Sequence, residues 1–123
     1  MRKILTAALA GVLILSSYVA YAAEPESKTV AQLNQEKAAL AGQMVRVQGK
    51  VVKVNNGIMK RNFVHVQDGT GDQNSNNLIV TSKQTANVGD SVMITGLVVL
   101  DRDFGAGYSY PLLIEESTIT PVK

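Results

Sequence analysis

The feature that most constrains the fold is an alternation of apolar residues with a period of two, which runs through most of the chain. Successive side chains of a β-strand point to opposite faces, so this spacing predicts strands. In the first strand Val45 and Val47 are apolar, whereas after Gly49 the apolar positions move to Val52 and Val54. A slip of one residue at a glycine indicates a β-bulge or a sharp bend, and a long bent strand can belong to two sheets.

Four further strands are expected after this one. In the second strand Val64 and Val66 face the interior, which turns Phe63, His65 and Gln67 outward. Turn signals separate the strands, among them Asn55-Asn56-Gly57 and Val88-Gly89-Asp90. The five predicted strands span residues 43–54, 62–68, 77–81, 91–100 and 108–116, and Ile119 can extend the last.

A helix is expected before the first strand. The segment Thr29-Val30-Ala31-Gln32 has the spacing of a capping box, and good helix formers follow as far as Gly42. These signals predict a helix from Val30 to about Ala41 that covers one open end of a barrel.

Together the elements predict an all-β chain folded as a five-stranded OB-fold barrel with a short N-terminal helix. An SH3-like barrel is the alternative. The chain contains no cysteine, so no disulfide stabilises it and one core must do so. The segment Asp68–Asn76 places an oxygen ligand at every second residue, at Asp68, Thr70, Asp72, Asn74 and Asn76, but Ile79 replaces the glutamate that an EF-hand requires.

The first residues have the layout of a secretory signal peptide. A basic start, Met1-Arg2-Lys3, precedes an uncharged run and a small-x-small processing site, Ala20-Tyr21-Ala22. An uncleaved membrane anchor is the alternative, because about twenty uncharged residues just span a bilayer. Cleavage after Ala22 predicts a periplasmic protein. The expected organisation is a signal peptide at residues 1–22, a flexible lead at 23–28 and an OB-fold domain at 29–123.

Removing the signal peptide changes the net charge. Of twelve basic residues, Arg2 and Lys3 leave with it, so ten remain against ten acidic residues. A protein that binds nucleic acid by neutralising phosphates normally carries a basic excess. The charge of the mature chain therefore disfavours nucleic acid as its ligand.

Three segments carry a family resemblance: Val45–Val54, Asn62–Gly71, and Val88-Gly89-Asp90 with the alternating residues as far as Gly96. They resemble the bacterial periplasmic OB-fold proteins, and most closely the small NrfJ-like group, often met near multihaem cytochrome and nitrite-reductase genes. The resemblance extends from about Thr29 to Glu116. It implies an OB-fold, a periplasmic location and an accessory role beside such a system. Many OB-folds place a full helix between strands three and four, whereas Ser82–Val88 has room for about one turn.

The aromatic residues indicate where a ligand would bind. Without the signal peptide only Phe63, Phe104, Tyr108 and Tyr110 remain, at the start of the second strand and before the fifth. In OB-folds the loops between strands one and two and between strands four and five wall the ligand groove. Cations flank the second strand. The predicted ligand-binding residues are Lys53, Lys60, Arg61, Phe63, His65, Tyr108 and Tyr110. The alternative is that Phe63 packs beneath a loop and the cations are only solvated.

No catalytic residue, cofactor or metal is predicted. The chain has no cysteine nucleophile, no serine elbow and no obvious triad, which indicates a protein that is not an enzyme. His65 is the only histidine and lacks the ligand cluster of a zinc site. The sequence thus predicts a monomeric, non-enzymatic periplasmic binding module for a small ligand or partner protein. The alternatives are single-stranded nucleic-acid binding and haem or metal handling through His65.

Overall fold

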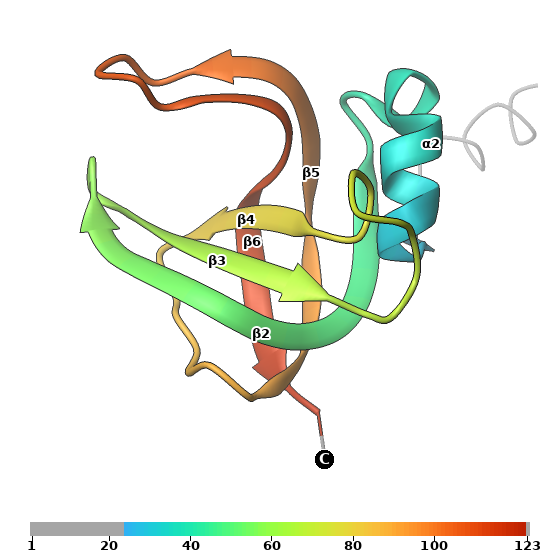
Figure 1. The fold of residues 1–123 in the computed structure, drawn as a ribbon, viewed down its shortest axis with the longest axis horizontal. Coiled ribbons are helices and arrows are strands. Elements are labelled where there is room, and N and C mark those ends of the chain that lie inside the picture. Colours follow the sequence, from blue (N-terminus) through green and yellow to red (C-terminus); the bar gives the residue numbers. More distant parts are fainter. Residues whose placement is uncertain (1–23, 123) are drawn as a thin grey trace, which may run out of the picture.

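The computed structural model describes residues 24–122, so the expected signal peptide lies outside the described residues. No helix within residues 24–122 is long and apolar enough to cross a membrane. The elements, in chain order, are β1 (Glu26–Ser27), α2 (Val30–Leu40), β2 (Met44–Ile58), β3 (Arg61–Gln67), β4 (Leu78–Ser82), β5 (Ser91–Asp103) and β6 (Ser109–Pro121) (Figure 1).

The strands form a partly closed barrel. Their order is β1-β2-β3-β4-β6-β5, and a further pairing of β2 with β5 closes the ring. Residues 44–50 of β2 pair with β5, whereas residues 50–58 pair with β3. The prediction of a long first strand shared between two parts of the sheet is therefore confirmed. The predicted slip at Gly49 lies next to this switch, and the register shift itself falls between Val51 and Lys53.

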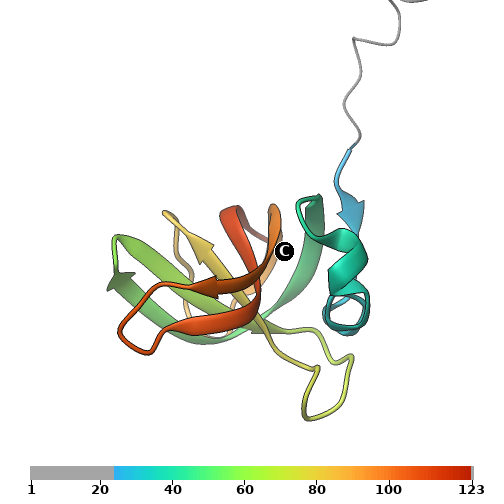
Figure 2. The ribbon, with the colours of Figure 1, turned by 90° about the horizontal axis from the view of Figure 1, so that it is seen from above.

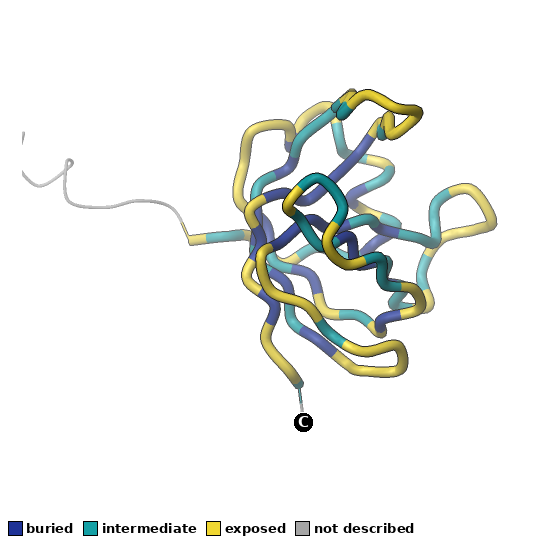
Figure 3. The backbone as a smooth tube through the Cα atoms, turned by 90° about the vertical axis from the view of Figure 1, so that its left-hand side faces the viewer, coloured by how far each residue is buried: buried dark blue, intermediate teal, exposed yellow. Residues whose placement is uncertain are grey.

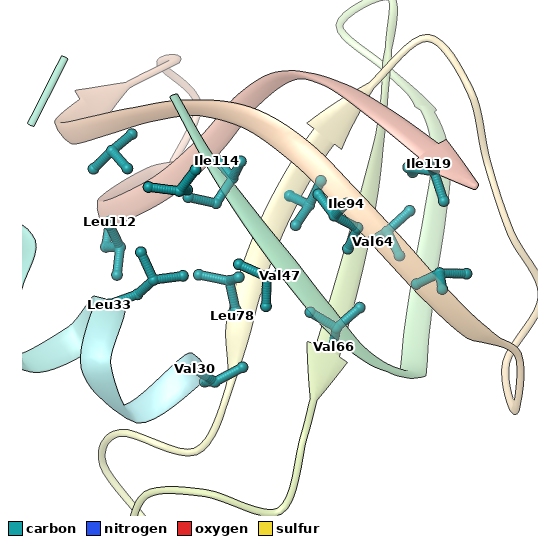
Figure 4. Packing of buried hydrophobic residues seen from close by; sticks show 14 of the residues in the cluster. Val30, Leu33, Val47, Val64, Val66, Leu78, Ile94, Leu112, Ile114 and Ile119 are labelled. Atoms are coloured by element: carbon teal, nitrogen blue, oxygen red, sulfur yellow. The ribbon is translucent and has the colours of Figure 1, made fainter. Parts of the chain in front are cut away.

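The core fills the inside of the barrel, and α2 covers it from one end. Figure 4 shows Val30 and Leu33 of α2 pointing toward Val47 and Leu78. The predicted helix and its capping box are confirmed, because Thr29 and Gln32 exchange side-chain-to-backbone hydrogen bonds. Burying a Leu or Val side chain contributes about 1.5–3 kcal/mol, so this apolar face holds the helix on the barrel.

The predicted turn at Asn55-Asn56-Gly57 is wrong. Strand β2 continues to Ile58, and a register shift between Asn55 and Ile58 takes up Gly57, whose φ is 72°. The chain reverses at Met59 and Lys60, which have φ of 50° and 65°. A tight hairpin whose two central residues both have positive φ follows the twist of its strands, while the glycine serves a bulge instead.

Part of the expected flexible lead belongs to the sheet. Glu26 and Ser27 pair in parallel with Val45 and Arg46. Lys28 then makes ion pairs with Glu26 at 3.4 Å and with Glu36 of α2 at 2.9 Å. A hydrogen bond to Glu36 raises the pKa of Lys28. Residues 26–28 thus join β2 to α2.

The last two strands run beyond their predicted ends, to Asp103 and Pro121. The Val98 N–H donates to the Gln43 carbonyl and the Val98 carbonyl accepts from the Gly42 N–H, and beyond Val98 strand β5 pairs with β6 alone. We call residues 99–112 of this hairpin the arm. Figures 1 and 2 show that its tip lies on the same side of the molecule as the tip of the β2–β3 hairpin.

Candidate functional site

The outer face of β3 does not carry an exposed phenylalanine, so the prediction that Phe63 faces solvent is wrong. Val64 and Val66 do belong to the barrel core, and Phe63 does point away from it, as the alternation requires. The arm nevertheless folds over this face and leaves Phe63 only 1% exposed. Its ring centroid lies 5.6 Å from those of Phe104 and Tyr110. The alternative, a phenylalanine packed beneath a loop, is the one that the structure shows.

Burial of this ring has a clear energetic reason. Covering a phenylalanine contributes about 1.5–3 kcal/mol, and each favourable aromatic pair adds about 0.5–1.5 kcal/mol. Phe63 pairs with Phe104, Tyr110 and Tyr108, the last at 6.4 Å. These four residues are the aromatic cluster. Partial burial raises the pKa of Tyr110, and Tyr108 adds to the shift.

Two arginines flank the aromatic cluster and converge on one carboxylate. The guanidinium carbons of Arg61 and Arg102 lie 4.9 and 4.6 Å from the centroid of the Phe104 ring. Arg102 Nη1 donates to Glu115 Oε2 at 3.0 Å, and Arg61 Nε lies 3.8 Å from Glu115 Oε1. The hydroxyl of Thr81 also donates to Glu115 Oε1, at 3.4 Å. The side chain of Glu115 is 7% exposed, and a carboxylate so buried requires such partners.

A groove of about 790 Å³ is lined by residues that include Arg61, Arg102 and Glu115. It runs between the β2–β3 hairpin tip and the end of β4 on one side and strands β5 and β6 on the other. Figure 3 views this side of the molecule, where exposed loops surround buried strand segments. The lining residues are Met59, Lys60, Arg61, Thr81, Ser82, Lys83, Gln84, Leu97, Val99, Arg102, Glu115, Glu116 and Ser117.

A bulge in β6 directs two consecutive carboxylates toward this groove. The pairing of β5 with β6 shifts between Thr95 and Leu97, and Glu116 has φ of 52°. Gly96 makes room for the bulge, because a Cβ there would lie 2.4 Å from Ser117 Oγ and 2.9 Å from the Glu115 carbonyl oxygen. Bulges and positive φ at non-glycine residues often occur where a side chain is aimed at a functional site.

The predicted site residues fall into three groups. Lys60 and Arg61 line the groove, whereas Phe63, Tyr108 and Tyr110 form the aromatic cluster beside it. Lys53 and His65 are paired neighbours on β2 and β3, and neither lines the groove.

His65 is half-buried, with Nδ1 3.5 Å from Asn77 Nδ2. Burial and the charge of Lys53 both lower its pKa. Haem or metal handling through His65 stays a prediction.

Sequence reasoning missed several groove residues, above all Arg102, Glu115 and Lys83. A signal for Glu115 was present, because the carboxylate directly continues the apolar run Leu112–Ile114. Charged side chains are almost never fully buried unless they are paired, so its partners should have been sought among the nearby cations. Arg102 lies between Asp101 and Asp103, and a cation between two carboxylates is typical of an ordinary polar loop.

The loop after β3 uses its oxygens within the protein. Asp68 Oδ2 accepts from the Val30 N–H at 2.9 Å, and Thr70 Oγ1 accepts from the Ala31 N–H at 3.0 Å. Asp72 Oδ1 accepts from the Asn74 N–H at 2.9 Å. The described residues contain no group of three or more His, Cys, Asp or Glu side chains that could hold a metal ion.

The fold has a counterpart among solved structures, in a protein described as an aspartyl-tRNA synthetase from Leishmania major Friedlin. The likeness has a TM-score of 0.57 at 10% sequence identity, and it covers 83% of this chain and 21% of that one. No family model matches the sequence, and no curated protein matches it. At this identity the likeness shows the fold alone. Residues 24–122 thus form an all-β OB-fold barrel with one short helix.

Proposed function

We propose that this protein is a non-enzymatic binding module of the periplasm whose groove holds a small ligand or a side chain of a partner protein. The observation that carries the proposal is the groove of about 790 Å³ beside the β2–β3 hairpin. OB-folds bind ligands between this hairpin and the one formed by the last two strands. Small-molecule sites usually measure about 300–1,000 Å³ and combine apolar walls with a few placed polar groups.

The chemistry of the groove supports binding rather than catalysis. Among the described residues its one buried carboxylate, Glu115, is paired with two arginines, and the only histidine of the chain, His65, lies elsewhere. General acid–base catalysis needs a group within hydrogen-bond reach of the reacting atom, with a proton to give or take. A carboxylate committed to two guanidinium groups is a positioning group instead.

The periplasmic location belongs to the proposal through the sequence. Its support is the signal-like segment at residues 1–22 together with the resemblance to periplasmic OB-fold proteins. The same resemblance supports an accessory role beside a multihaem cytochrome or nitrite-reductase system.

The test is an NMR titration of the purified, isotope-labelled protein with phenyl phosphate, benzoate and benzyl alcohol. We expect at least one of these compounds to shift the amide signals of Arg61, Lys83 and Arg102. Lys53 and His65 supply the internal control, because they lie outside the groove. If no compound moves the groove signals, or the shifts map to Lys53 and His65, the groove is not the binding site.

A second candidate function is binding of single-stranded nucleic acid. It is favoured by the groove cations Lys60, Arg61, Lys83 and Arg102, and by the name of the synthetase that shares the fold. Against it, the rings of the aromatic cluster pack against one another edge-on or tilted, and Phe63 is 1% exposed, so it offers no surface to a base. Fluorescence anisotropy with a labelled oligothymidylate at several salt concentrations tests it. Binding that weakens steeply with salt supports this function, and absence of binding at low salt excludes it.

A further inference from the structure

We infer that the groove recognises a small organic dianion, with a phosphomonoester-type head group between Arg61 and Arg102 and a short apolar body along β5. The inference rests on the proposed function and names the class of ligand. Glu115 is then the internal counter-ion of the two arginines, and the charge of the ligand balances the positive charge that remains.

The charge of the groove lining favours a dianion. Four cations line it, Lys60, Arg61, Lys83 and Arg102, against the two carboxylates Glu115 and Glu116. The lining therefore carries two more positive than negative charges. A phosphomonoester carries about −1.5 to −2 charges at neutral pH, which matches this excess, whereas a monocarboxylate leaves part of it unbalanced.

The arrangement of the guanidinium groups favours a phosphate head group. Both lie over the ring of Phe104, with their Cζ atoms 4.9 and 4.6 Å from its centroid. The hydrogen bonds of the described residues use one N–H of each, Arg61 Nη1 to the Met59 carbonyl at 3.3 Å and Arg102 Nη1 to Glu115. A guanidinium group has five N–H donors in a rigid fork that suits bidentate binding of phosphate oxygens. Contact with the ring that orients the fork beforehand lowers the cost of binding.

The position of Glu115 fits the role of a counter-ion. Two arginines on one phenylalanine ring repel each other, and a buried carboxylate between them keeps both in place without a ligand. The same negative charge weakens the binding of every anion to these arginines. Replacing Glu115 by glutamine keeps an oxygen acceptor and removes that charge. The arginine side chains are 35% and 41% exposed, so the dielectric constant is close to that of water, and this change should tighten the binding of a dianion about tenfold.

The apolar wall of the groove favours an organic ligand over an inorganic ion. Leu97 and Val99 are half-buried and alternate along β5 with Gly96 and Val98, which are buried. Their side chains therefore lie on the outer face of β5, along the groove. Each methylene that a ligand buries there should improve affinity about fourfold. A bare inorganic ion would leave this wall unused.

The experiment is isothermal titration calorimetry with phenyl phosphate, inorganic phosphate, benzoate and benzyl alcohol. We expect phenyl phosphate to bind tightest, inorganic phosphate and benzoate each at least tenfold more weakly, and benzyl alcohol most weakly. Arg102→Gln should lower the affinity for phenyl phosphate at least tenfold, and Glu115→Gln should raise it about tenfold. Lys53→Gln, which removes a cation outside the groove, is the matched control and should leave affinity unchanged.

Each other outcome has a defined meaning. Equal affinity for benzoate and phenyl phosphate, with groove signals still shifted in NMR, overturns the dianion and leaves the binding function standing. No binding by any compound, with no NMR shifts, overturns both. Weaker binding by Glu115→Gln contradicts the counter-ion role.

Leu97→Ser provides a further variant should Glu115→Gln fail to fold. It keeps every groove charge and should weaken phenyl phosphate several-fold more than inorganic phosphate. Equal losses of affinity for both compounds would show that the apolar wall is not part of the binding site.

Discussion

At the scale of single residues, Phe63 on the outer face of β3 packs against the arm instead of facing solvent. The alternation of the strand places Phe63 outside the barrel core, where it could have been a stacking platform. Instead the arm covers it, so its ring contributes to stability and Arg61 on the same face reaches Phe104 and Glu115. The residue thus organises the groove indirectly, by holding the arm that carries Phe104 and Arg102.

The first prediction concerns this ring. Phe63→Ala should destabilise the protein by about 3–5 kcal/mol, because it leaves a cavity beneath the arm. Urea unfolding followed by circular dichroism measures the change. Tyr108→Ala is the matched control: this ring is 37% exposed, so its loss should cost much less. Equal effects of the two substitutions would contradict the buried role of Phe63.

At the scale of elements, the loop after β3 caps helix α2 from a distance. The first N–H groups of a helix lack partners within it, and Asp68 and Thr70 accept two of them, from Val30 and Ala31. Partial burial raises the pKa of Asp68, but the hydrogen bonds from Thr70 and Val30 outweigh this effect and lower it below its ordinary value of 3.8. The loop that looked like a calcium ligand set therefore joins the helix to the barrel.

The second prediction follows from this cap. Asp68→Ala should cost about 1 kcal/mol of stability at neutral pH, the usual loss for a capping side chain. Because the folded pKa is lowered, the carboxylate stabilises the native state above its ordinary pKa, and this contribution disappears as the pH falls through the folded value. The difference between native protein and variant should therefore be full at neutral pH and smaller in strong acid. Thermal unfolding measured at both pH values gives the two differences, and one that grows in acid would contradict the assignment.

At the scale of the whole molecule, the barrel consists of a closed ring of strands and an arm that extends beyond the ring. Residues 44–50 of β2 and the facing part of β5 have strand partners that close the ring, whereas the arm extends past that closure. The groove lies where the two parts meet, since Leu97 is the last β5 residue that pairs with β2 and Val99 begins the arm. The position of the arm thus controls the shape of the groove.

The third prediction is that the arm is the less protected part. Its β5 segment hydrogen-bonds to β6 alone, so it can open without breaking the ring. Amide hydrogen exchange measured by NMR should show faster exchange for residues 99–112 than for residues 45–50 and 92–97. Uniform protection across these segments would mean that arm and barrel open only together.

Much of the architecture followed from local patterns. The alternation, the capping box and the strand order predicted the OB-fold with its helix, because periodicity and caps depend on neighbours within a few residues. The hairpin turn was misplaced, since Asn55-Asn56-Gly57 fits either a turn or a bulge and only pairing with β3 selects the bulge.

The candidate site also has features that follow from local patterns and features that depend on distant contacts. The sequence by itself determined which side chains of β3 point away from the barrel core and which cations flank this strand. Only the tertiary structure decided that the arm folds onto Phe63 and that Arg61 and Arg102, from separate hairpins, share Glu115. The physical reason is that a strand's alternation assigns a side chain to a face, whereas what covers that face depends on contacts between residues far apart in the chain.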